Sequence, residues 1–357
     1  MARLLALIGG MEAFVKPGQS VLVKPNLLSD CTPDEAVTTH PEVVRAVVRA
    51  VKQAGAKPWV ADSPSNAVHL QRVWEKTGME AICRAEDVPL VNLEKGGSEE
   101  FETRGIRFRI AKAVLQADAI VSLPKVKTHV LTGLTAGVKN MYGAVPGFQK
   151  TSLHKDYPRR DDFADLLVAV YSRAKPVLSI ADGVVGMEGN GPSGGTPVAL
   201  HFLAASDDAV ALDVVVARLL GLEFDGVSCL AAARRGDAGQ TDESRIAIVG
   251  ERLEGLAPDE FRLPWTVPAQ RIPPWIARML ISMLWHRPSF SGQCVFCGQC
   301  VRACPVGALA QQAGERPVLA PRKCIACCCC HEVCPARAIE MRPSPLFRLI
   351  RRARGRR

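Results

Sequence analysis

CVFCGQCVRACP (294–305) and CIACCCCHEVCP (324–335) are two copies of one cysteine pattern, C-x2-C-x2-C-x3-C-P, near the end of this chain. The spacing is the bacterial run for a [4Fe-4S] cluster, in which each of four irons takes one thiolate. Because the runs repeat after 30 residues, they predict a small α+β, ferredoxin-like domain that holds two clusters. The chemistry of such clusters is one-electron transfer.

In two-cluster ferredoxins the fourth cysteine of each run binds the other cluster. The expected metal ligands are therefore Cys294, Cys297, Cys300 and Cys334 for cluster 1, and Cys324, Cys327, Cys330 and Cys304 for cluster 2. Structural zinc, which takes paired C-x2-C units in one site, fits this spacing poorly. A disulfide framework would need an oxidising compartment.

Five further cysteines fall outside the pattern. Cys328 and Cys329 are either small buried side chains beside the cluster, which we favour, or an alternative ligand or redox-tuning thiol. We expect Cys31, Cys83 and Cys229 to be ordinary buried thiols. His331 is expected to hydrogen-bond near the cluster without binding it.

The composition is that of a globular protein of two domains. The chain has 357 residues, 48% of them hydrophobic, and a mean hydropathy of +0.08. No uncharged apolar run reaches the ~18 residues of a membrane span, and the N-terminus is charged too early for a secretory signal. Reduced cysteines without such a signal predict a cytoplasmic protein.

Six of the nine net positive charges come from arginines at 348–357, in a basic tail expected at 342–357, which leaves the rest of the chain near +3. The pI of 9.0 is therefore no argument for nucleic-acid binding, and none is expected. The favoured interpretation of the tail is a solvated end. The alternative is peripheral contact with an acidic partner or an anionic membrane surface.

Residues 1–255 alternate short apolar runs with amphipathic helices. Strands are expected at 21–23, 59–61, 88–93, 118–123, 177–180, 198–204 and 246–249, and helices at 38–55 (with a threonine cap), 67–77, 163–170 and 207–220. Such alternation predicts an α/β domain with a mostly parallel sheet and helices on both faces. A Pro/Trp-rich linker at 256–290, with a short helix at 275–285, leads to the two-cluster domain at 291–341.

Polar side chains follow several of these strands, where ligands of open parallel sheets bind. They are Lys24 and Asn26, then Asp62, Ser63 and Ser65, then Lys125, Lys127 and His129, and finally Asp182. We predict that this strand-end rim is the functional site; solvated turn residues are the alternative. His129 and His154 are the best acid–base candidates.

Two more stretches resemble ligand loops. Residues 137–143 include Lys139 and Asn140, and residues 187–195 are rich in glycine. Backbone N–H groups of such loops can hold phosphate or carboxylate. Neither loop matches a Walker or G-x-G-x-x-G motif, so neither ATP nor NAD is predicted.

The segments VKPNLL (23–28), TTHPEVV (38–44), ADSP (61–64), LPKVKTH (123–129), GVKNMYG (137–143) and ADG (181–183) together resemble the family called domain of unknown function 362. The C-terminal part resembles the two-cluster ferredoxin module often fused to it. The resemblance implies a bacterial or archaeal iron–sulfur protein and no defined reaction. Such proteins usually begin with an extra strand and helix, of which only the helix end at about 4–14 is found here, so we expect the sheet to be one strand short.

Three functions remain open. The first is an iron–sulfur oxidoreductase, whose clusters relay electrons to an anionic substrate or cofactor held by Lys24, Asn26, Lys125, Lys127, Lys139 and Asn140. Asp62 and Asp182 would position the ligand or bind a metal, and His129 would move protons. The second is a non-catalytic electron carrier with a partner-docking domain. The third is a maturation factor that holds a metal or cofactor precursor.

Overall fold

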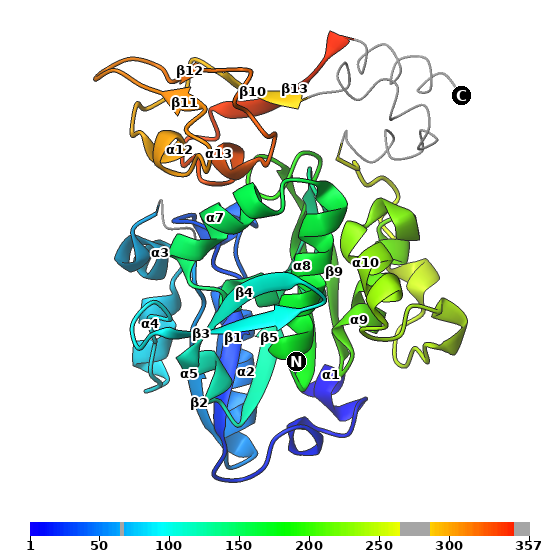
Figure 1. Ribbon diagram of the computed structural model, residues 1–357. Helices are drawn as coiled ribbons and strands as arrows, with labels where there is room; N and C mark the ends of the chain where they lie inside the picture. Colours follow the sequence, from blue (N-terminus) through cyan, green and yellow to red (C-terminus); the bar gives the residue numbers. More distant parts are fainter. Residues whose placement is uncertain (65–67, 265–285, 346–357) are drawn as a thin grey trace.

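Figure 1 shows the computed structural model, which describes residues 1–64, 68–264 and 286–345. The predicted helix at 275–285, Ser65 and most of the basic tail lie outside the described residues. The larger domain is built on a seven-stranded sheet with the order β2-β1-β5-β8-β6-β7, in which β9 also pairs with β8. The strands are β1 Ser20–Pro25, β2 Lys57–Val60, β5 Ala119–Leu123, β6 Lys125–His129, β7 Gly133–Thr135, β8 Leu178–Glu188 and β9 Thr196–Ser206.

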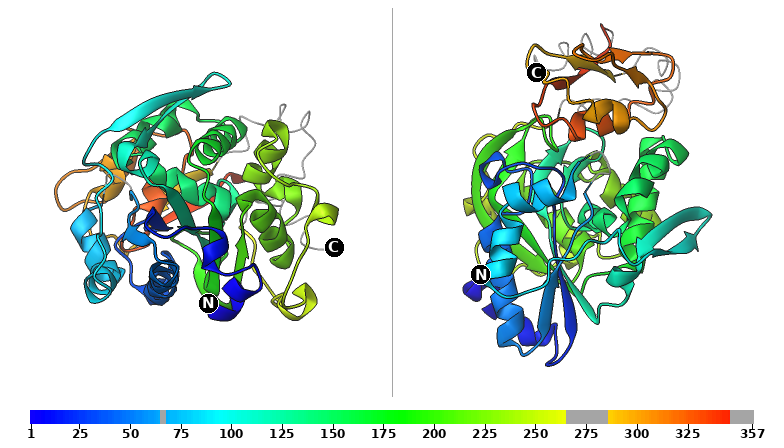
Figure 2. Two further views of the ribbon diagram at one scale, coloured as in Figure 1. Left: turned by 90° about the horizontal axis from the view of Figure 1, so that it is seen from below. Right: turned by 90° about the vertical axis from the view of Figure 1, so that its left-hand side faces the viewer.

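Five strands of this sheet are parallel, and β7 and β9 run antiparallel to β6 and β8. Successive side chains of β1 point to opposite faces of the sheet, so Val21 and Val23 pack in the hydrophobic core on one face and Leu22 packs in the core on the other. One face is covered by α1 Ala2–Ala6, α2 Pro41–Gln53, α3 Leu70–Lys76 and α4 Met79–Ala85. The other is covered by α6 Gly137–Asn140, α8 Arg160–Arg173, α9 Ala209–Leu219 and α10 Ser228–Gly236 (Figure 2). The predicted α/β class is confirmed.

Smaller elements border this core. They are the hairpin β3 Ser98–Thr103 and β4 Ile106–Ala111, and the helices α5 Lys112–Leu115 and α7 Gly147–Asp156. The hairpin was not predicted, because its alternation leaves many side chains exposed. No described helix has the length and apolar character needed to cross a bilayer.

Three local predictions were wrong. α2 is capped by His40, whose Nδ1 accepts from the Glu42 N–H at 3.2 Å, and not by a threonine. Thr39 instead donates to the carbonyl of Leu123, which ties the helix start to β5. Residues 88–93 make only an isolated bridge at Leu90, and residues 246–249 form no strand, because Ile248 and Val249 stay largely exposed beside β9.

The C-terminal module has two short antiparallel ladders and two one-turn helices. The ladders pair β10 His286–Phe290 with β13 Ile339–Pro343, and β11 Leu309–Ala310 with β12 Val318–Leu319. The helices α12 Gln299–Arg302 and α13 Cys329–Glu332 occupy equivalent positions in the two cysteine runs. Figures 1 and 2 show this module seated on one end of the larger domain.

Candidate functional site

A cavity of about 70 Å³ lies between the strand-end rim and the C-terminal module. The larger domain lines it with residues that follow β1 and β2 and with residues of the segment from α6 to α7. The module closes the other side with Cys329, Glu332 and Val333. These three positions, i, i+3 and i+4, share one face of α13 and its C-cap. Their counterparts 30 residues earlier are Gln299, Arg302 and Ala303, so only the second repeat faces the cavity.

The cysteines of the two runs surround two separate hollows. Cys294, Cys297, Cys300 and Cys334 line one, and Cys304, Cys324, Cys327 and Cys330 line the other. These are the two predicted ligand sets, each completed by the last cysteine of the other run. No group of three His, Cys, Asp or Glu side chains in the described residues could hold a single metal ion.

Backbone N–H groups support the two crossing cysteines in the same way. Ala308 donates to Cys304 Sγ at 3.1 Å, and Ala338 donates to Cys334 Sγ at 3.2 Å. Hydrogen bonds to sulfur stabilise thiolates and tune cluster potentials.

The two extra cysteines have different surroundings. Cys328 has φ of +68°, and the equivalent Gly298 has +72°, a conformation that favours glycine. Its buried side chain packs with Val130 and Met341, between the two domains. Cys329 is also buried, but it lines the cavity.

Lys24 and Asp62 form a buried ion pair below the cavity. Lys24 Nζ lies 2.7 Å from Asp62 Oδ1, and the side chains are 0% and 4% exposed. The second oxygen of Asp62 accepts from the Leu27 N–H at 2.7 Å, and Lys24 also donates to the carbonyl of Asn140. A β-carbon on Gly143 would collide with this pair. The pair thus ties the ends of β1 and β2 to α6.

Lys125 and Lys127 are also buried, and neither lines the cavity. Lys125 pairs with Asp182 at 2.8 Å, and burial lowers the pKa of this lysine despite the carboxylate. Asp182 further accepts from the N–H groups of His40 and Val184. Lys127 donates to Asn26 Oδ1 at 2.8 Å and to the carbonyl of Val37. Burial and the charge of Lys139 lower the pKa of Lys127 to about 7.

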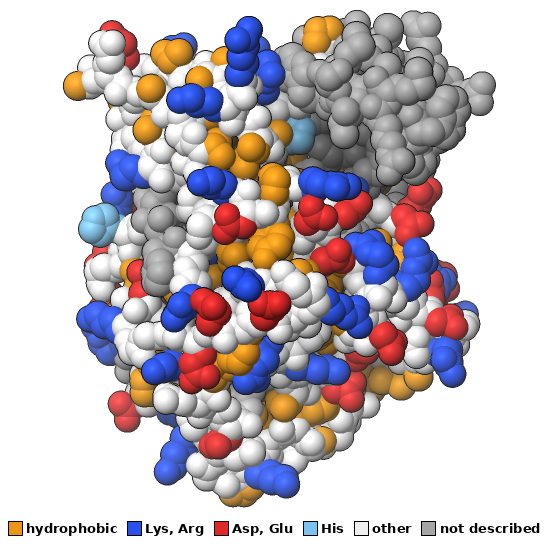
Figure 3. All heavy atoms as spheres, in the orientation of Figure 1, with side chains coloured by type: hydrophobic (Ala, Val, Ile, Leu, Met, Phe, Trp, Pro, Cys, Tyr) orange, Lys and Arg blue, Asp and Glu red, His pale blue; other side chains and the backbone are white. Residues whose placement is uncertain are grey.

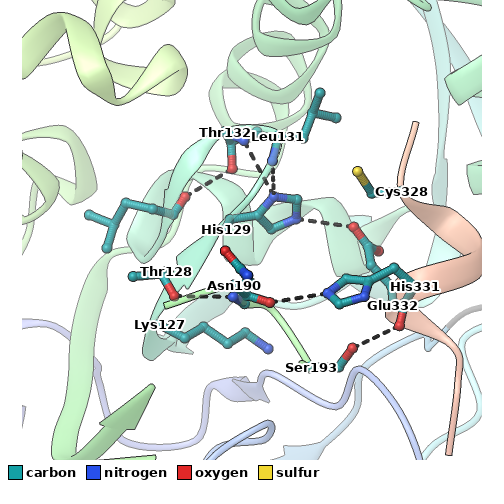
Figure 4. A network of polar contacts seen from close by, with 12 residues as sticks. Lys127, Thr128, His129, Leu131, Thr132, Asn190, Ser193, Cys328, His331 and Glu332 are labelled. Carbon is teal, nitrogen blue, oxygen red and sulfur yellow. Dashed lines mark hydrogen bonds and ion pairs between the residues drawn. The ribbon is translucent and has the colours of Figure 1, made fainter. Parts of the chain in front are cut away.

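His129 lies at the domain interface, where its Nε2 is 3.1 Å from Glu332 Oε1 (Figure 4). Its Nδ1 accepts from the N–H groups of Leu131 and Thr132, so the proton resides on Nε2. Burial lowers the pKa of His129 to about 3. Burial alone would raise the pKa of Glu332, but the close contact with His129 and the charge of Lys139 lower it, so the carboxylate stays ionised.

A second set of contacts fixes the module through His331. Its ring nitrogens lie 2.7 Å from the carbonyl of Ile339 and 3.1 Å from that of Asn190, and its own carbonyl accepts from Ser193 Oγ (Figure 4). A β-carbon on Gly194 would collide with the imidazole. The glycine-rich loop 187–195, expected to bind a ligand, therefore serves to dock the module.

The start of the second predicted ligand loop, 137–143, binds a carboxylate of the protein itself, whereas its later residues line the cavity. The N–H groups of Gly137 and Val138 donate to the two carboxylate oxygens of Asp213 at 2.6 and 3.0 Å. Burial raises the pKa of Asp213 to about 7. Sequence reasoning missed Asp213, because it lies inside the apolar helix α9.

The cavity retains a cationic wall. Lys139 lines it and makes no hydrogen bond or ion pair with any described residue. Lys150 donates to the carbonyl of Ser63, and burial lowers its pKa to about 8. His154, stacked on Phe163 at 4.2 Å, is also on this wall, and burial lowers its pKa to about 4.

The structure thus separates the predicted rim residues into two groups. Asn26, Asp62, Lys139 and Asn140 line the cavity. Lys24, Lys125, Lys127 and Asp182 lie in buried polar contacts, and His129 is at the domain interface. Tyr142, in the predicted loop 137–143, also lines the cavity, and sequence reasoning missed Lys150, Cys329 and Glu332 as cavity residues.

The fold and the cysteine-rich module define an iron–sulfur protein with an α/β domain. The chain belongs to the family described as "Domain of unknown function (DUF362)", which matches residues 21–218, and a "4Fe-4S binding domain" matches residues 291–310. It is 39% identical over 262 residues to "Thylakoid-associated protein sll1697" of Synechocystis sp. (strain ATCC 27184 / PCC 6803 / Kazusa), across 73% of this chain and 81% of that protein.

Among solved structures, the chain resembles the lactate racemase apoprotein from Thermoanaerobacterium thermosaccharolyticum. The TM-score is 0.43 at 15% identity, over 62% of this chain and 54% of that one. So weak a likeness carries no argument about function.

Proposed function

We propose that this protein is an iron–sulfur oxidoreductase in which two [4Fe-4S] clusters exchange electrons with a small anion bound in the interface cavity. The observation that carries the proposal is that residues of both domains line this cavity. Cys329, Glu332 and Val333 lie on one side, within the second cysteine run, and the strand-end rim lies on the other. A molecule in the cavity would therefore be adjacent to cluster 2, whose ligands would be Cys324, Cys327, Cys330 and Cys304.

The charges favour an anionic ligand. The ammonium group of Lys139 has no partner among the described residues, and its charge contributes to the lowered pKa values of Lys127, His129, His154 and Lys150. An anion would compensate this charge. The volume of about 70 Å³ is several times the roughly 10–15 Å³ that a single water needs, so the cavity has room for a small ligand.

Lys139, Lys150 and the Lys24–Asp62 pair each have a part in this mechanism. The clusters supply or accept single electrons when bound. Lys139 holds the anion, and the Lys24–Asp62 pair keeps the cavity floor in place. Lys150, with a pKa of about 8, is close enough to neutral pH to give a proton to the reduced ligand and regain it from solvent. Proton transfer through Lys150 replaces the role expected of His129.

The same features bear on the alternatives. A maturation factor would need metal ligands on the rim, but the oxygens of Asp62 and Asp182 are engaged by lysines and N–H groups. A bare electron carrier would have no use for a cationic cavity beside its cluster. We propose the cytoplasm as its compartment, because eight thiolates must stay reduced to bind iron.

The test is native mass spectrometry of protein purified without oxygen. We expect two cluster masses and one additional small anion. Lys139→Met should lose the anion and keep both clusters, and the control Lys175→Met, which replaces an exposed lysine, should keep all three. Zinc in place of iron, or an anion retained by Lys139→Met, would contradict the proposal.

A further inference from the structure

We propose that an acidic one-electron carrier protein docks over cluster 1, at a face formed by Val295, Phe296, Cys297, Arg302 and Arg316. This cluster 1 face would be the entry point for electrons, and the interface cavity their destination. The inference rests on the proposed clusters, but it does not depend on what the cavity binds.

The first argument is exposure. Val295 and Phe296 are 59% and 46% exposed, although both are large hydrophobic residues. They lie between Cys294 and Cys297, and Cys297 is the exposed member of the eight predicted ligands. The residues of α13 beside cluster 2 are instead covered by the larger domain. Cluster 1 is thus the one that a protein in solution can approach most closely.

The second argument is that hydrogen bonds fix the loop that carries Val295 and Phe296. Phe296 has φ of +56°, and its carbonyl accepts from Gln311 Nε2. The same amide of Gln311 donates to the carbonyl of Glu315 at 2.7 Å, which brings the loop with Arg316 against the loop that carries Phe296. Arg302 donates to the carbonyl of Cys297 at 3.2 Å. Because this loop is already ordered, less conformational entropy is lost when a partner binds to it.

The third argument is charge. Arg302 and Arg316 are exposed, Arg302 on Cys297 and Arg316 beside Gly292, and neither forms an ion pair with a carboxylate among the described residues. Glu315, next to Arg316, is the acidic residue of this loop, and Glu340 elsewhere on the module is paired with Arg342. Basic and hydrophobic side chains predominate on the part of the module that faces the viewer in Figure 3. An apolar centre with a basic surround fits a partner of the opposite charge.

The test is the rate at which a reduced flavodoxin, an acidic carrier, reduces the oxidised protein under anaerobic stopped-flow conditions. We expect the rate to fall with added salt, and to fall by about tenfold or more in Arg316→Glu. Phe296→Asn, which tolerates the left-handed backbone, should also slow it. Reduction by dithionite should be unchanged in both variants. Arg245→Glu and Val249→Ser, exposed changes on the larger domain, serve as controls.

Equal rates for wild type and both variants would overturn the proposal, as would equally fast exchange with a basic cytochrome c. If Arg316→Glu lost a cluster, Phe296→Asn would decide the question alone. Lys139→Met should leave the flavodoxin rate unchanged, so this proposal and that of the cavity ligand fail separately.

Discussion

The Lys24–Asp62 pair predicts that a lysine of the rim acts on stability rather than on the substrate. Lys24→Met would leave the carboxylate of Asp62, 4% exposed, without its counter-ion. Removing one partner of a buried ion pair costs about 3–5 kcal/mol. For a domain of this size each kcal/mol lowers Tm by about 2–4 °C, so the expected decrease is about 6–20 °C.

The assay is thermal unfolding of the anaerobic protein at matched cluster content. Lys24→Met with Asp62→Asn should recover about 2 kcal/mol or more, because no charge remains buried and the amide oxygen still accepts from Leu27. Arg84→Met, which breaks an exposed helical pair with Glu80, should cost about 0.5 kcal/mol or less. A loss below about 1 kcal/mol in Lys24→Met, or no recovery in the double variant, would refute the structural role of the pair.

Three further predictions follow from the site. Cys304→Ser should remove cluster 2 and leave cluster 1, whereas Cys329→Ser should keep both, as iron and sulfide analysis would show; loss of a cluster in Cys329→Ser would make this thiol a ligand. Burial holds the pKa of His154 near 4, below the ordinary 6.5, so the unfolded chain binds the proton first and stability falls as pH drops from about 6.5 towards 4, by up to about 1.4 kcal/mol per pH unit. Denaturant midpoints should be compared at pH 7.5 and 5.5 in the wild type and in His154→Phe. Asp213, whose raised pKa of about 7 favours the folded state as pH falls, opposes His154 in this window, and Lys127 and His129 contribute to both proteins. The variant should therefore lose less stability than the wild type between the two pH values, and an equal loss would contradict the assignment. Asp213→Leu leaves two buried N–H groups at the start of α6 without acceptors and should cost about 2–6 kcal/mol, measured by urea unfolding, whereas a neutral effect would mean that the N–H groups find other partners.

The sequence predicted the parallel sheet well, because its strands are short apolar runs that end in polar residues. It did not predict the direction of β9, since an antiparallel strand can carry the same apolar pattern. The prediction for residues 246–249 was wrong. Their apolar side chains indicated a buried strand, but Ile248 and Val249 instead line an exposed groove. Hydrophobicity alone does not say which side of an apolar run is covered.

The polar rim was predicted as a set, but its internal pairing was not. Lys24 and Asp62 meet because β1 and β2 are in the register that pairs Val23 with Val60, a fact that the sequence does not contain. Likewise, Cys329 and Glu332 lie within the recognised cysteine run. Their place on the cavity wall depends on how the module docks, through Asn190, Ser193 and His331.

The most direct test of the central claim is whether electrons pass from the clusters to the molecule in the cavity. The dithionite-reduced protein, freed of excess reductant, would be mixed without oxygen with the anion released from the purified protein, and the visible absorption of the clusters followed. The account predicts rapid reoxidation in the wild type and in Lys175→Met, and slow reoxidation in Lys139→Met. Clusters that stay reduced in the wild type while the anion is bound would show that the cavity binds a ligand but does not receive electrons.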